Sequence, residues 1–289
     1  MRVLMATDGS QRGVAALAAA GRMLSTVNRE IDLMCVVPKV PAHKMHPDRL
    51  YRRAQHILDK TQKSFCAAGL AVRTKISTGS AARIILGASY NYDVTVVAST
   101  SRRSGPMAGL GPVASRLAEH SRRVTLLARE SRGETGCRIL VAVDGSEGSL
   151  QALSKMVETI ELTDAEVTLV HVVETPWVPG PDQEWLGYHE DEEDGIEGQP
   201  HLQDELVREA DGILATACER IPEHTELKTL IYEGIPADEI LGEADRGDYD
   251  LVVIGASGVT DLKHQVLGSV SSKVAWNAPC SVLLVRPES

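Results

Sequence analysis

The chain has 289 residues, of which 43% are hydrophobic and 24% charged, a composition typical of a globular protein with material for two domains of about 100–200 residues each. The net charge of −10 combines two opposite contributions, because residues 1–133 carry a net charge of +13 and residues 134–289 carry −23. The longest apolar runs are far shorter than the ~18 residues of a membrane span, and the first residues lack the pattern of a signal peptide. We therefore expect a cytoplasmic protein with no membrane partner.

The predicted elements alternate between strands and helices. Strand-like stretches of the first half lie at the start of Arg2–Ser10 and at Ile31–Val37, Asp93–Val97 and Val124–Arg129. Those of the second half predict strands at about Cys137–Val143, Glu166–Val172, Glu226–Tyr232, Asp250–Ile254 and Ser281–Val285. A period of 3.6 residues predicts helices near Glu147–Ile160, Leu202–Arg220, Pro236–Arg246 and Ser269–Asn277. Apolar strands separated by helices indicate an α/β fold with a parallel, doubly wound sheet of Rossmann-like type.

The chain is an internal repeat. Arg2–Ser10 aligns with Arg138–Ser146 at an offset of 136 residues, and six of the nine positions are identical. Val124–Arg129 aligns with Ser281–Arg286 at an offset of 157, so the second copy carries an insertion. We predict two tandem five-stranded domains, residues 1–130 and 137–289, joined by a polar linker at 131–136, with the insertion at about 177–200.

Glycines gather after the fourth strand of the second half. Gly255 and Gly258 follow that strand, and Gly268 opens the last helix together with Ser269. Glycines let backbone N–H groups approach an anion closely, and a helix N-terminus adds unpaired donors and a partial positive charge. Asp144, after the first strand of this half, is expected at the same edge of the sheet. From spacing alone, a plain turn followed by a helix cap explains these residues as well.

The pattern Val-Ala-Val-Asp-Gly-Ser that ends at Ser146, and the spacing Gly255-x2-Gly258-x9-Gly268-Ser269, resemble the universal stress protein family. The resemblance covers nearly the whole chain, twice, and the complete glycine spacing is similar to the ATP-binding branch of the family. It implies an adenine nucleotide alpha hydrolase-like fold whose domains pair through their last strands. It also implies ATP, ADP or AMP as the ligand, with Mg as the accompanying cation.

Carried over by position, the resemblance implies a nucleotide site in the second domain. Asp144 and Ala142 would lie at the adenosine end, and the backbone of Val172 would meet the adenine edge. The residues that would meet the ribose and phosphates are Gly255, Gly258, Gly268, Ser269, Val270 and Ser271. Asp144 has a second interpretation, since an Asp between a strand and Gly-Ser often only forms an Asx turn.

The first half departs from this pattern. At an offset of 157, Gly255 becomes Ala98, Gly258 becomes Ser101 and Ser269 becomes Pro112, which lacks an N–H group. We predict that the first domain binds ATP poorly or not at all. Arg102 and Arg103 of its loop either hold an anion or are solvated loop charges.

The resemblance implies a nucleotide-dependent stress-response or regulatory protein, whose protein partner the sequence does not name. The chain contains no GxxxxGK[ST] or GxSxG motif and no pairing of acid, base and nucleophile, so we assign no catalytic residues and no metal ligands. Two alternatives stay open: a slow ATPase or phosphotransferase on the same loop, and a nucleotide-independent interaction scaffold. Aromatic residues are only 3% of the chain, which argues against a nucleic-acid partner.

Three further expectations concern cysteines, the insertion and charge. The five cysteines are dispersed and form no CxxC pair, which favours free thiols, with Cys35 and Cys280 buried. Asp182–Glu197 holds eight carboxylates, which predicts a solvated loop or a lid over the nucleotide. Trp177 and Trp185 would pack this loop over the nucleotide or against the first domain. The opposite charges of the halves are expected to attract each other, and a homodimer stays open.

Overall fold

The structure is a computed structural model that describes residues 1–39, 47–99, 109–130, 137–174, 200–256 and 267–286. Its strands are β1 (Arg2–Ala6), β2 (Glu30–Val37), β3 (Val72–Thr78), β4 (Val94–Ala98), β5 (Val124–Ala128), β6 (Cys137–Ala142), β7 (Ala165–Val173), β8 (Glu226–Glu233), β9 (Leu251–Gly255) and β10 (Ser281–Val285). Its helices are α1 (Gln11–Met23), α2 (Pro47–Ala67), α3 (Ala81–Ser89), α4 (Pro112–His120), α5 (Glu147–Thr159), α6 (Pro200–Cys218), α7 (Pro236–Arg246) and α8 (Ser269–Asn277). No helix among the described residues is long and apolar enough to span a membrane.

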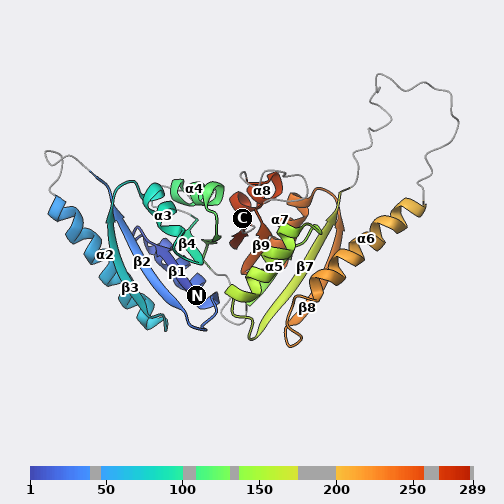
Figure 1. The fold of residues 1–289 in the computed structure, drawn as a ribbon, viewed down its shortest axis with the longest axis horizontal. Coiled ribbons are helices and arrows are strands. Elements are labelled where there is room, and N and C mark those ends of the chain that lie inside the picture. Colours follow the sequence, from blue (N-terminus) through green and yellow to red (C-terminus); the bar gives the residue numbers. More distant parts are fainter. Residues whose placement is uncertain (40–46, 100–108, 131–136, 175–199, 257–266, 287–289) are drawn as a thin grey trace, which may run out of the picture.

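All ten strands belong to one sheet, in the order β3-β2-β1-β4-β5-β10-β9-β6-β7-β8. Every neighbouring pair runs parallel except β5 and β10, which are antiparallel and join the two halves. The sheet therefore consists of two parallel five-stranded units with the same strand order, placed side by side through their last strands (Figure 1). The predicted α/β class and the doubly wound, Rossmann-like parallel units are confirmed.

Both faces of the sheet are covered, which is why the strands are almost continuously apolar. Val3 and Met5 of β1 pack in the core beneath α1, α2, α5 and α6, whereas Leu4 packs in the core beneath α3, α4, α7 and α8. Each of these two cores contains residues from both halves of the chain. The long helices α2 and α6 lie on the two outer flanks of the molecule (Figure 1).

The two halves also meet beside the β5–β10 pair, and these contacts follow the repeat. Arg129 donates to the carbonyl oxygens of Ala275 and Cys280 at 2.8 and 3.0 Å. Its counterpart Arg286 donates to those of Ala118 and Glu119 at 3.0 and 2.7 Å. A guanidinium after each last strand therefore caps the last helix of the other half. This exchange is typical of a two-fold symmetric interface.

A second pair of symmetric contacts lies at the ends of α1 and α5. Leu24 and Ile160 form an antiparallel bridge, and they occupy equivalent positions in the repeat. The Ser25 amide donates to the Thr159 carbonyl at 2.8 Å, while the Glu161 amide donates to the carbonyl of Met23 at 2.8 Å. The approximate two-fold relation therefore extends from the strands to the helix ends.

Opposite charge does not form this interface in the part of the chain that the structure describes. Each ion pair shown between described residues joins two residues of the same half. The contacts between halves are chiefly a strand pair, a bridge and guanidinium bonds to carbonyl oxygens. Charge contributes at Glu161, which accepts a hydrogen bond from the Thr26 hydroxyl at 3.4 Å and attracts Arg29 of the first half. The expectation that the charges of +13 and −23 hold the halves together is therefore not supported by direct contacts.

The five cysteines lie within the described residues and all are free thiols. Cys35 and Cys280 are buried, as predicted. Burial raises the pKa of the Cys137 thiol to about 12, so this thiol stays protonated at neutral pH.

Candidate functional site

Asp144 follows β6 at the carboxyl edge of the second half, where it forms an Asx turn. Its Oδ1 accepts hydrogen bonds from the Ser146 amide at 3.0 Å and from the Ser146 hydroxyl at 2.6 Å. Gly145 between them has a φ of 77°, a left-handed conformation that glycine adopts without strain. The side chain of Asp144 is exposed, and the structure shows no described residue bonded to its Oδ2. One carboxylate oxygen thus shapes the turn, while the other faces outward.

Two serines fix the start of α5 next to this turn. Ser146 is the N-cap residue, and its hydroxyl oxygen accepts a hydrogen bond from the Ser149 amide at 3.2 Å. The buried Ser149 hydroxyl donates to the Ser146 carbonyl at 2.9 Å and accepts from the Asp144 amide at 3.3 Å. These bonds hold the turn rigidly to the helix. The sequence analysis missed Ser149, although a serine three residues after an N-cap serine is a signal of this network.

Gly255 ends β9 directly beside the backbone of α5. A Cβ at this position would lie 3.0 Å from the Gly148 carbonyl oxygen and 3.3 Å from the Ser149 amide nitrogen. Backbone atoms cannot move aside as the end of a flexible side chain can. Gly255 therefore has a packing role of its own, separate from the contact with ribose or phosphate that the resemblance implies.

The N-terminus of α8 lies at the same edge and is tied to the end of β9. The Gly268 amide donates to the Ala256 carbonyl at 2.8 Å, and the buried Ser271 hydroxyl donates to the Gly255 carbonyl at 2.6 Å. The N-cap position is Gly268, so no side chain caps the helix. The first-turn amides of a helix have no partners inside it, which leaves donors here at the carboxyl edge.

The Ser271 hydroxyl is not a free donor, because its single proton is used in the bond to Gly255. The amide of Ser271, and both the amide and the hydroxyl of the exposed Ser269, are not used in that bond. The hydroxyl role that the sequence predicts for this pair therefore falls to Ser269.

Ala142 and Val172 form an apolar wall at the carboxyl ends of β6 and β7. Both lie on the face that α7 and α8 cover, and Val270 of α8 packs against the same core. Ala142 pairs with Val170, so Val172 lies two residues further along the neighbouring strand. The structure thus brings this wall, the Asp144 turn and the start of α8 to one edge of the sheet.

Helix α7 is held beside this edge by a carboxylate that the sequence analysis missed. Glu243 accepts hydrogen bonds from the hydroxyl groups of Tyr232 at 2.7 Å and Tyr249 at 3.0 Å. The bond to Glu243 raises the pKa of Tyr232, and burial raises the pKa of Tyr249 to about 12. Both tyrosines therefore stay protonated donors at neutral pH, which keeps α7 attached to β8. The sequence signal for this contact is a Glu in a predicted helix with a Tyr before and a Tyr after that helix.

The first half repeats the turn but not the helix start. Asp8 accepts a hydrogen bond from the Ser10 amide at 2.8 Å, and Gly9 has a φ of 72°. Helix α4 begins with Pro112, which has no amide proton, after the N-cap Gly111. The Asx turn thus occurs without the glycine pattern of the second half.

A cavity of about 150 Å³ nevertheless lies at this edge of the first half. Six of its lining residues are equivalent by the repeat to residues of the second half that end the strands or start the last helix: Ala6, Thr7, Asp8, Val36, Ala98 and Val113. Most of the lining side chains are apolar. The fold therefore builds a hollow at this position even where the glycines are missing.

Some predicted features fall outside the described residues. These are Gly258, the linker at 131–136, Arg102 and Arg103, and the acidic insertion Asp182–Glu197 with Trp177 and Trp185. His171, in contrast, is half-buried, and its Nδ1 lies 2.8 Å from the Val143 carbonyl oxygen. His171 therefore has a hydrogen-bond partner within the fold. Within the described ranges, no three His, Cys, Asp or Glu side chains come together as a metal site.

Comparisons with known proteins agree with this architecture. The model of the universal stress protein family matches residues 1–129 and again residues 137–286. A universal stress protein of Mycolicibacterium smegmatis is 27% identical over 302 aligned residues, which cover 99% of this chain and 97% of that protein. Universal stress protein YxiE of Bacillus subtilis is 34% identical over 150 residues, which are 52% of this chain and 98% of that protein.

Among solved structures, the crystal structure of a universal stress protein from Archaeoglobus fulgidus has a TM-score of 0.67 and 20% sequence identity, covering 99% of this chain and 98% of that chain. The likeness therefore extends over both halves and their arrangement in one sheet. The family match, repeated at residues 1–129 and 137–286, shows that the chain belongs to the universal stress protein family.

Proposed function

We propose that the second half of the chain binds an adenine nucleotide, with ATP as the first candidate, and that this binding regulates the protein in a stress response. The observation that carries the proposal is the uncapped N-terminus of α8. It begins at Gly268 and is anchored to β9 by the bonds to Ala256 and Gly255. Unpaired amides and the helix dipole favour a phosphate group at such a position.

The residues around this helix start fit the other parts of a nucleotide. Ala142 and Val172 suit an aromatic base, because their side chains are apolar and both lie at the carboxyl ends of their strands. The outward oxygen of Asp144 suits the hydroxyl groups of a ribose, since a carboxylate oxygen accepts hydrogen bonds from hydroxyls. The amides of Ser269, Val270 and Ser271 suit the phosphates. Since no metal cluster of side chains occurs in the described ranges, a divalent cation would be held chiefly by phosphate oxygens.

The test is calorimetric titration of the whole chain with ATP, ADP and AMP. We expect about one site per chain, and a rise in the unfolding temperature with nucleotide, because a ligand that binds only the folded state stabilises it. Gly268 has a φ of −59°, which any residue adopts, so Gly268→Val adds bulk at the helix start without backbone strain. We expect this variant to lose ATP binding.

The repeat supplies a matched control. Gly111 is the N-cap of α4, is equivalent to Gly268 and has a φ of −66°. Gly111→Val should leave ATP binding unchanged, because Pro112 already removes a first-turn amide there. Unchanged binding in Gly268→Val, or equal losses in both variants, would overturn the assignment to the second half.

The same purified chain distinguishes two alternative functions from nucleotide binding without turnover. A slow ATPase or phosphotransferase predicts multiple-turnover phosphate release that Asp144→Ala abolishes. A nucleotide-independent scaffold predicts that ATP leaves the unfolding temperature unchanged.

A further inference from the structure

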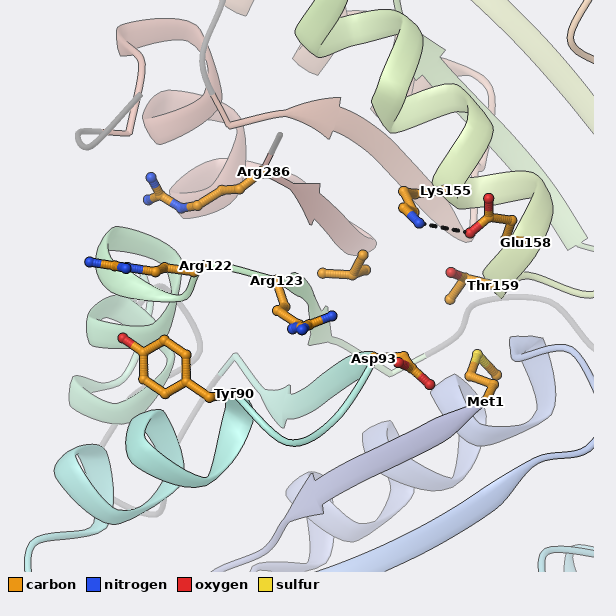
Figure 2. Close-up of a pocket in the computed structure, with 10 residues that line it drawn as sticks. Met1, Tyr90, Asp93, Arg122, Arg123, Lys155, Glu158, Thr159 and Arg286 are labelled. Carbon is orange, nitrogen blue, oxygen red and sulfur yellow. Dashed lines mark hydrogen bonds and ion pairs between the residues drawn. The ribbon is translucent and has the colours of Figure 1, made fainter. Parts of the chain in front are cut away.

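A cleft of about 430 Å³ lies between the two halves, at the amino edge of the first half. Its lining from the first half precedes β1, β4 and β5, and its lining from the second half comes from the end of α5 and from beyond β10. The residues are Met1, Tyr90, Asp93, Arg122, Arg123, Val124, Lys155, Glu158, Thr159 and Arg286 (Figure 2). Because β5 and β10 are antiparallel, this is the side at which β10 ends, so Arg286 follows Val285, which pairs with Gly255 at the end of β9.

Cationic side chains outnumber carboxylates in this cleft. It contains three arginines and a lysine against Asp93 and Glu158. Both carboxylates already accept from the protein, because Asp93 accepts from the Arg2 amide at 2.7 Å and Glu158 pairs with Lys155 at 2.9 Å. The excess charge of the lining is therefore positive.

Arg122 and Arg123 supply the guanidinium groups that carry this excess. Both side chains are exposed, and within the described residues the structure shows neither a hydrogen bond nor an ion pair for either side chain. Continuing the register of β10 with β5, in which Leu284 faces Thr125, places Arg286 opposite Arg123. The Arg286 guanidinium is itself bonded to the carbonyl oxygens of Ala118 and Glu119, so Arg122 and Arg123 are the arginines of this lining whose side chains have no described partner.

Thr159 adds a hydroxyl group from the second half. Thr159 is only 3% exposed, yet it lines the cleft. The structure shows no described partner for its hydroxyl group. Figure 2 shows Arg123 between the side chains of α5 and those of Arg122 and Tyr90. In Figure 2 the Arg123 side chain extends toward α5, whereas that of Arg122 extends to the opposite side, so Arg123 and Thr159 are the donors of the two halves that face each other.

Three of the four cations of this lining occur on one side of the two-fold relation only, whereas Arg286 has Arg129 as its counterpart. By the repeat, Arg122 and Arg123 correspond to Pro279 and Cys280, and Lys155 corresponds to Ala19. None of these counterparts carries a positive charge. The cluster is thus not a consequence of the repeated fold, which would place the same groups on both sides.

We propose that this cleft binds a small molecule carrying a phosphoryl group, held chiefly by Arg122 and Arg123 with the Thr159 hydroxyl. Guanidinium groups bind the oxygens of a phosphoryl group through paired hydrogen bonds, and they do so best where two can act together. A ligand in this position contacts both halves at once and therefore stabilises their arrangement. The proposal does not depend on the nucleotide site.

The probe is inorganic pyrophosphate, titrated into the whole chain by calorimetry at low salt, with succinate as a dicarboxylate comparison. We expect pyrophosphate to bind more tightly than succinate. The double variant Arg122→Gln with Arg123→Gln should weaken pyrophosphate at least about tenfold, the factor expected for lost bonds to a charged group. Thr159→Val should weaken it by about fivefold, the effect of one hydrogen bond.

The matched control is Arg52→Gln with Arg53→Gln, which removes an equally exposed pair of arginines from α2. It should bind pyrophosphate as the parent chain does. Equal losses in both double variants would mean a general charge effect and would overturn the proposal, as would tighter binding of succinate or no binding at all. Gly268→Val should retain this binding. Loss there, with retention in Arg122→Gln/Arg123→Gln, would mean that pyrophosphate occupies the nucleotide site, which would overturn the cleft but not the proposed function.

Discussion

At the contact between the first helix and the fourth strand, the glycine lies on the helix in the first half and on the strand in the second half. In the first half, Gly13 of α1 lies next to Ala98, and a Cβ on Gly13 would be 3.6 Å from that of Ala98. In the second half, Ser149 occupies the helix position and Gly255 the strand position. Each contact therefore keeps one glycine. The replacement of Gly255 by Ala98 has a packing explanation in addition to the loss of a ligand-binding loop.

We expect Gly255→Ala to lower the free energy of unfolding by about 1–3 kcal/mol, because the added methyl group would overlap the Gly148 backbone. Gly87→Ala is the control, since this exposed glycine in α3 has no atom within 4 Å of the added Cβ. The control should be neutral or stabilise by less than about 1 kcal/mol. Urea unfolding of both variants measures the difference. Equal stability would show that β9 does not need a glycine here.

A buried carboxylate in the first half makes stability depend on pH. Asp32 is 1% exposed and accepts hydrogen bonds from Lys75 at 2.6 Å, Tyr92 at 2.6 Å and Arg73 at 3.0 Å. Burial by itself would raise the pKa of Asp32, but these three bonds together lower it below its usual value. The unfolded chain therefore binds the proton more readily than the folded chain does.

It follows that the contribution of Asp32 is complete above its unfolded pKa of about 4 and is lost as the pH falls through the lower folded pKa. Asp32→Asn should cost about 2 kcal/mol at pH 7 and less in acid. Denaturant midpoints of both chains, followed from neutral pH into the acid range, measure this convergence. A difference that stays constant with pH would contradict the role of the charge.

At the scale of elements, the joining of the halves depends on two arginines placed after the last strands. Arg129 is half-buried, and burial lowers its pKa to about 10, so it stays charged at neutral pH. Its guanidinium donates to carbonyl oxygens at the end of α8 and before β10. The end of α8 in the second half is thus capped by an arginine of the first half.

Arg129→Ala should lower the free energy of unfolding by about 2–3 kcal/mol, because two bonds from a charged donor are lost. Arg129→Lys should recover only part of this, since an ammonium group cannot reach both oxygens as a planar fork does. Arg116→Ala, at an exposed position of α4, is the control and should change little. Thermal unfolding compares the three variants. If Arg129→Ala loses no more stability than Arg116→Ala, Arg129 does not stabilise the interface.

At the scale of the whole molecule, the halves share both hydrophobic cores and one continuous sheet. The opposite net charges of the halves are a property of their sequences, whereas most of the described contacts between halves are apolar or made to backbone carbonyls. Salt screens charges but leaves such contacts in place.

We therefore expect one cooperative unfolding transition in calorimetry, and a radius of gyration that stays constant between about 0.05 and 1 M NaCl. Small-angle scattering measures the second quantity. Two separate transitions, or expansion of the chain at high salt, would show that charge holds the halves together after all.

Much of the architecture was predictable because its causes are local. The periodicity that predicts Pro236–Arg246, Ser269–Asn277 and Ser281–Val285 agrees with the structure residue for residue. The boundaries of the other elements of the second half differ by at most two residues. Among candidate site residues, the positions at the sheet edge follow from strand direction. The domain boundaries, the role of the acidic insertion and the ligand itself stay predictions.

By itself, the sequence determined the repeat, the α/β class, the strands and helices, and the free, partly buried cysteines, because hydrophobic period and turn residues act over a few neighbours along the chain. Only the tertiary structure decided that Gly255 packs on the backbone of α5, that Arg129 and Arg286 exchange between halves, and that Arg122 and Thr159 line one cleft. These contacts join residues far apart in the chain. Their geometry depends on how the strands pair and the helices pack, which no local pattern records.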